Sequence, residues 1–114
     1  MRVAALVDDL LDRSRITAAL PDAATCRDRA AIEDADVIVV DLAHHAPDVA
    51  PLRAAWPNAR IVAYGAHVDD AALAAAQADG ADLALPRSRF FRDPAAAVAG
   101  PSGAVPPSRG AGEG

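Results

Sequence analysis

The stretch "DVIVVDLAHH", residues 36–45, holds the pattern that decides the fold. Its first half is rich in β-branched apolar residues, which favour strands, and it is too short for a typical helix. The apolar run ends at Asp41, which two histidines follow. We therefore interpret residues 36–40 as a central buried strand that has Asp41 at its carboxyl end.

Apolar runs on either side of this strand predict four more, over residues 2–7, 23–27, 60–65 and 81–85. Helices are predicted between and after them, over residues 10–20, 29–35, 46–56, 70–79 and 94–99. The helix over 46–56 is a poor one because prolines interrupt it, whereas Asp69 and Asp93 are good caps for the last two helices. This alternation predicts an α/β fold with a doubly wound, five-stranded parallel sheet.

The composition suits one soluble domain. The chain has 114 residues and a net charge of -5, and such a charge disfavours nucleic-acid and anionic-membrane partners. The single Cys26 cannot form an internal disulfide, and no stretch reaches the ~20 apolar residues of a membrane span. We expect a cytoplasmic protein with a domain over residues 1–99 and a disordered tail over residues 100–114, which holds no DNA-binding output.

Ligand sites in such sheets lie at the carboxyl ends of the strands, and polar residues gather there in the sequence. The loops after the strands carry Asp8 and Asp9, Asp41 with His44 and His45, Gly65 with His67, and Arg87 with Ser88. We expect carboxylates from two strands, a histidine and an arginine to converge at one edge. No Gly-rich phosphate loop follows the first strand, and no Ser-His-Asp or activated-cysteine arrangement is evident. A non-enzymatic role is therefore favoured.

Three motifs in this order resemble the receiver domain of bacterial two-component response regulators, over residues 1–99. They are "VDD" at 7–9, "VIVVD" at 37–41 and "AAAQADGAD" at 74–82. The resemblance implies a flavodoxin-like topology with strand order 2-1-3-4-5. It also implies that Asp41 is a phosphoacceptor and that Asp8, Asp9 and Asp41 bind a divalent cation such as Mg²⁺, the one cofactor expected.

The chain departs from receivers at three positions. Gly65 stands where receivers have a hydroxyl, Ala84 where they have an aromatic switch residue, and Arg87 where they have a lysine. The usual proline is also missing after Asp41, where this chain reads "LAHHAP". The pieces "GAHVDDAALA" and "LPRSRFF" look like a subgroup of stand-alone, receiver-like bacterial proteins, which favours a degenerate receiver.

Each candidate also has a plain structural interpretation. Aspartates are common at strand ends and helix caps, and His67 can simply be an exposed loop residue. Adjacent histidines tend to point apart, so a metal site on His44 and His45 is disfavoured. We expect Arg87, with Ser88, to form a static bridge to Asp41 in place of a phosphoryl contact.

The leading hypothesis is a stand-alone receiver-like signalling module that acts through protein–protein interaction and has a degenerate phosphorylation switch. Phe90 and Phe91 are predicted to belong to the partner surface, and an exposed Phe90 or Phe91 is the expected anchor. The partner is another signalling protein such as a histidine kinase, and a homodimer is compatible with this. The alternative is a conventional receiver in a phosphorelay, phosphorylated on Asp41 by a histidine kinase. A weaker alternative is a flavodoxin-like protein that binds a small ligand or a metal through His67 and Arg87.

Overall fold

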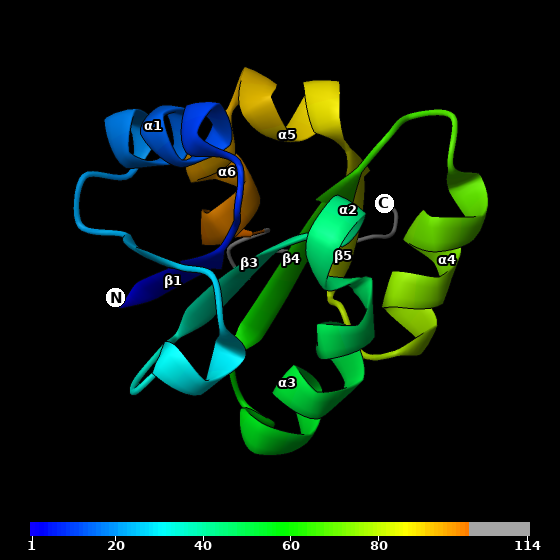
Figure 1. The fold of residues 1–114 in the computed structure, drawn as a ribbon, viewed down its shortest axis with the longest axis horizontal. Helices are drawn as coiled ribbons and strands as arrows, with labels where there is room; N and C mark the ends of the chain where they lie inside the picture. Colours follow the sequence, from blue (N-terminus) through cyan, green and yellow to red (C-terminus); the bar gives the residue numbers. More distant parts are fainter. Residues whose placement is uncertain (101–114) are drawn as a thin grey trace.

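The computed structural model describes residues 1–100, which form a five-stranded parallel sheet with helices on both faces (Figure 1). The strand order is β2-β1-β3-β4-β5, so the predicted fold class and topology are confirmed. The strands are β1 (Val3–Leu6), β2 (Ala24–Cys26), β3 (Val37–Asp41), β4 (Arg60–Gly65) and β5 (Leu83–Pro86). Every residue of β1 and β3 is buried, as the continuous apolar runs predict.

The helices divide between the two faces of the sheet (Figure 1). One face is covered by α1 (Leu10–Ala19), α5 (Arg87–Arg92) and α6 (Pro94–Ala99). The other face is covered by α2 (Leu42–His45), the 3₁₀ turn η2 (Ala46–Asp48), α3 (Val49–Ala55) and α4 (Asp70–Ala78). A further 3₁₀ turn, η1 (Arg29–Ala31), follows β2. Each face therefore has its own apolar core.

Four segments differ from the sequence-based expectation. The helix expected over residues 29–35 is only the turn η1, and the one expected over 46–56 is divided into η2 and α3. Pro51 is tolerated in α3 because it lies in the first turn, where its missing N–H has no partner to lose. The helices α2 and α5 were not predicted. The first begins directly where β3 ends, and the second directly where β5 ends.

Aspartates begin three of the helices, and one glycine follows the end of α4. Asp9 caps α1, Asp69 caps α4 and Asp93 caps α6. Gly80, just past α4, has φ = 122°, and a Cβ there would lie 2.7 Å from the side chain of Arg53. A side chain at position 80 is therefore unfavourable both for conformation and for space.

The predicted tail lies almost wholly outside the described residues, which end at Gly100. Within the described part, no helix is both long enough and apolar enough to cross a membrane.

Candidate functional site

The parallel sheet brings the polar residues together at its carboxyl edge. Asp41 is the register partner of Tyr64, and Gly65 is the register partner of Pro86, so β3, β4 and β5 end at adjacent points. Asp8 follows β1 after one buried residue, Val7. The local arrangement of these side chains decides what the edge can do.

His45 bridges two carboxylates. Its Nε2 lies 2.8 Å from Asp8 Oδ1 and its Nδ1 lies 2.7 Å from Asp48 Oδ2. Burial lowers the pKa of this imidazole, but the hydrogen bonds to Asp8 and Asp48 outweigh burial, so its pKa is raised. The hydrogen bond from His45 in turn lowers the pKa of Asp8. When His45 is protonated, its positive charge lies beside the carboxylate of Asp8.

Asp9 and Asp41 are both engaged as helix caps. Asp9 accepts a hydrogen bond from the backbone N–H of Asp12 at 2.9 Å. Asp41 Oδ1 accepts from the backbone N–H of Ala43 at 3.0 Å, and its Oδ2 lies 2.9 Å from His44 Nδ1. This last contact raises the pKa of His44. Asp41 is only 3% exposed, so its carboxylate is enclosed as well as bonded.

The carboxylates at this edge supply the oxygen donors that Mg²⁺ prefers. Within residues 1–100, however, no group of three or more His, Cys, Asp or Glu side chains is arranged to hold a metal ion. The hydrogen bonds above direct Asp8, Asp9 and Asp41 to three different partners. Their chemistry therefore suits a hard cation, but their present arrangement does not fit one.

Arg87 is held by a carboxylate that sequence reasoning missed. Its two terminal nitrogens donate to the two oxygens of Asp12, and the hydroxyl of Tyr64 donates to Asp12 Oδ2 at 3.0 Å. Asp12 is 1% exposed, and the hydrogen bonds from Arg87 lower its pKa despite the opposing effect of burial. The predicted bridge from Arg87 to Asp41 is therefore wrong, because Asp12 takes the guanidinium.

The position of Asp12 had a weak signal in the sequence. Asp12 lies one helical turn before Ile16, which is fully buried, so the two share the inward face of α1. An acidic residue on an apolar helix face needs a partner when it is buried. The partner could not be named from spacing, since Arg87 lies 75 residues further along the chain.

The aromatic residues at this edge form one packed cluster. Tyr64 stacks on Phe90 with ring centroids 4.9 Å apart, and Phe91 contacts both rings edge-on at 5.1 and 5.0 Å. Phe90 is 0% exposed, so the prediction that it is an exposed anchor is wrong; α5 turns it onto the sheet beside Tyr64. Phe91 is half-buried. Receivers have their aromatic switch residue at the position of Ala84, on β5. In this chain the aromatic ring is Tyr64, on β4, within the motif "RIVAYG".

The remaining predicted residues lie around a hollow at the ends of β4 and β5. Gly65 is buried, and a Cβ there would lie 3.4 Å from Leu42, which is ordinary contact. His67 and Ser88 are exposed. The hollow has a volume of about 410 Å³, and its lining consists of Arg15, Ala66, His67, Arg87, Ser88 and Phe91. Arg15 was not predicted to belong to this edge.

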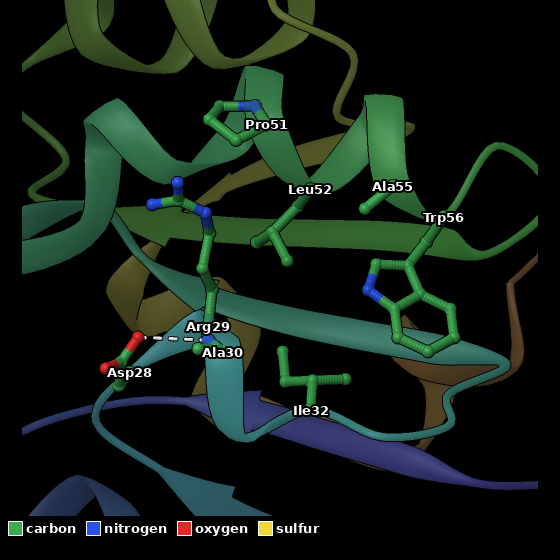
Figure 2. A pocket seen from close by; sticks show the side chains of 8 residues that line it. All are labelled: Asp28, Arg29, Ala30, Ile32, Pro51, Leu52, Ala55 and Trp56. Carbon is green, nitrogen blue, oxygen red and sulfur yellow. Dashed lines mark hydrogen bonds between the residues drawn. The ribbon is translucent and has the colours of Figure 1, made fainter.

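A second hollow, of about 400 Å³, lies between η1 and α3 (Figure 2). Figure 2 shows the side chains of Ile32, Leu52 and Trp56 turned into it. Its one basic residue, Arg29, is paired with Asp48 at 2.6 Å. This hollow is mainly apolar and shares none of its lining residues with the first one.

No protein-family model matches the sequence, and no curated protein matches it significantly. Solved structures do resemble the fold. A response regulator protein from Burkholderia pseudomallei, solved with a phosphorylated aspartic acid, a calcium ion and citrate, gives a TM-score of 0.73 at 22% identity. The alignment covers 85% of this chain and 65% of that one, so this chain spans less than two thirds of that protein.

Two further structures agree with this likeness. A response regulator receiver domain protein from Clostridium thermocellum gives a TM-score of 0.68 at 14% identity, with 81% of this chain and 86% of that chain covered. A response regulator from Thermotoga maritima gives 0.60 at 14% identity, with 75% and 83% covered. The described chain therefore has the fold of response-regulator receiver domains.

Proposed function

We propose that this chain is a receiver-like bacterial signalling module, without enzymatic activity, that works in the cytoplasm through contacts with another signalling protein and has a degenerate phosphorylation switch. The observation that carries this proposal is the internal pairing of three key residues at the carboxyl edge. Asp8 is paired with His45, Asp41 with His44, and Arg87 with Asp12. Groups that a phosphoryl switch needs free are bonded to one another.

The state of Asp41 supports the degenerate form of the switch. Formation of an acyl phosphate requires a carboxylate oxygen to attack a phosphoryl group directly. Each oxygen of Asp41 already has a hydrogen-bond partner and the residue is buried, so attack through Oδ1 competes with the cap of α2 and attack through Oδ2 competes with His44. Arg87, the cation expected to pair a phosphoryl group on Asp41, is bound to Asp12 instead.

The surface beside the acidic pair supports a role in protein contact. Leu10 and Leu11, at the start of α1, are 74% and 65% exposed. Adjacent exposed leucines are typical of a surface that another protein covers. Leu10 and Leu11 are therefore the anchors of the partner surface in place of the buried Phe90. Phe91 is partly accessible and can still contribute to that surface.

A conventional phosphoacceptor is the second candidate. It is favoured by the presence of Asp8, Asp9 and Asp41 at one edge, and by the phosphorylated aspartic acid in the fold neighbour from Burkholderia pseudomallei. In that case phosphate from a histidine kinase would displace His44 from Asp41, and a divalent cation such as Mg²⁺ would displace His45 from Asp8.

Amide NMR spectra distinguish the two candidates. The ¹⁵N-labelled chain is titrated with Mg²⁺ and then with beryllofluoride, an acyl-phosphate mimic, in the wild type and in Asp41→Asn. We expect no saturable shift at Asp41, Gly65 or Arg87 that depends on Asp41, because Asp8 and Asp41 are already paired with His45 and His44. A conventional receiver treated in parallel shows that the reagent is active. Saturable shifts that Asp41→Asn abolishes would refute the degenerate switch and establish the phosphoacceptor.

His45→Gln sharpens this experiment. Glutamine keeps a polar side chain of similar reach but cannot carry the positive charge that His45 places beside Asp8. If His45 is what excludes a cation, the variant gains Mg²⁺-dependent shifts at Asp8 and Asp9 that the wild type lacks. His44→Gln, at a more exposed position, is the matched control and should not gain them at Asp8.

A further inference from the structure

The hollow at the ends of β4 and β5 has walls that offer mainly hydrogen-bond donors. Arg15 reaches it from α1, Arg87 and Ser88 from the start of α5, and His67 from the loop after β4. Guanidinium groups only donate, and the hydroxyl and imidazole can each donate one hydrogen bond. No carboxylate belongs to its lining. Such a wall favours an anion.

The charge balance of the two arginines leaves a positive charge at the hollow. The ion pair with Asp12 neutralises Arg87, and the two oxygens of Asp12 already accept from Arg87 and Tyr64. Asp12 is also buried, so it does not face a ligand in the hollow. Among the ion pairs of residues 1–100, none contains Arg15. Its charge is therefore available to a ligand.

Phe91 orients the two guanidinium groups. The central carbon of Arg15 lies 4.4 Å from the centroid of the Phe91 ring, and that of Arg87 lies 5.1 Å from it. Contacts between a cation and a ring face hold the planar group in place without using its N–H donors. Arg87 is further fixed by Asp12, and its side chain is still 42% exposed. The donors are thus positioned before any ligand arrives.

We propose that this hollow binds a phosphoryl group, either as free phosphate or as part of a small phosphate monoester. Arginine forks match the geometry of phosphate oxygens, and a phosphoryl dianion uses the charge of Arg15 together with the remaining donors of Arg87 and Ser88. The volume of about 410 Å³ exceeds what free phosphate needs, and Phe91 supplies an apolar wall for an organic part. The site does not use Asp41, although it shares Arg87 with the edge described above.

The test is an amide NMR titration of the whole chain with inorganic phosphate and, separately, with phenyl phosphate. We expect saturable shifts at Arg15, His67 and Ser88 with a dissociation constant in the millimolar range, which corresponds to roughly -4 kcal/mol. Tighter binding of phenyl phosphate assigns the site to monoesters, and equal binding assigns it to the phosphoryl group alone. Asp41→Asn should leave both titrations unchanged, which separates this site from the switch.

Two arginine variants make the result specific. Arg15→Gln should weaken binding about tenfold or more, the loss expected for one charged contact of ~1.4 kcal/mol. Arg89→Gln is the matched control, because it removes the same charge from an exposed position on α5 outside the hollow, and binding should change less than twofold. Equal losses in the two variants, or shifts that do not saturate, would overturn the proposal. Both arginines are exposed, and circular dichroism checks that each variant is folded.

Discussion

Replacing Asp12 with alanine removes the carboxylate that holds Arg87 and Tyr64 in place. Asp12 is 1% exposed and accepts hydrogen bonds from both terminal nitrogens of Arg87 and from the hydroxyl of Tyr64. In Asp12→Ala, the hydroxyl of Tyr64 stays buried without this acceptor, and the guanidinium keeps its charge without a counter-ion. We expect the variant to be folded but clearly less stable.

The size of the loss follows from the burial of the three groups. Breaking a buried ion pair by removing one partner costs about 3–5 kcal/mol, because the other charge stays uncompensated. Arg87 is 42% exposed and can recover water, so we expect the lower end, about 3 kcal/mol. Tyr64→Phe removes a single hydrogen bond and should cost only about 1 kcal/mol.

The third variant, Arg87→Met, leaves the carboxylate of Asp12 buried and unpaired at neutral pH. Its destabilisation relative to the wild type should become smaller in acid. The folded-state pKa of Asp12 is lowered by Arg87, so this stabilising contribution is present above the ordinary pKa of 3.8 and is lost as pH falls through the folded-state value. The double variant Asp12→Ala with Arg87→Met should cost less than the sum of the two single changes, because they remove the same contact.

Urea unfolding measures these free energies. Trp56 is the only tryptophan and lies on the other face of the sheet, so its fluorescence reports global unfolding, and circular dichroism provides a second probe. The reasoning is refuted if Asp12→Ala costs less than about 1 kcal/mol, or if the Asp12 and Arg87 changes are additive.

Three other changes test the remaining features. The folded state raises the pKa of His45 above its ordinary value of 6.5, so protonated His45 stabilises the fold at low pH. The free energy of unfolding should therefore fall as pH rises above 6.5, and the stabilisation is lost once pH passes the folded-state pKa. One proton gives a slope of at most ~1.4 kcal/mol per pH unit, and His45→Gln should remove that share of the slope; urea midpoints that keep the wild-type slope would contradict this. Gly80→Ala should cost about 1–3 kcal/mol, since φ is positive and the new Cβ would meet Arg53 at 2.7 Å. Gly65→Ala is the comparison, with ordinary contacts from 3.4 Å, and should change stability by less than about 1 kcal/mol in thermal unfolding; similar losses at the two glycines would rule out the strain at position 80.

The elements of the fold could be predicted because their signals are local. The run before Asp41 became β3, "RIVAYG" became β4 without a change of boundary, and Asp69 and Asp93 cap the helices that they were expected to cap. Apolar periodicity and capping act over a few residues, so they can be recognised from the chain alone. Parallel pairing then places every strand end at one edge, which is why a gathering of polar residues there could be predicted before their contacts were known.

The contacts within that edge depend on residues far apart in sequence. His45 meets Asp8 across 37 residues, and Asp12 meets Arg87 across 75. Several carboxylates compete for each cation, and which pair forms depends on the exact direction in which α1, α2 and α5 leave the sheet. No pattern of spacing contains that direction, because it results from the packing of all the elements together. The sequence thus places acids and bases at the edge, and the folded chain selects which of them are paired.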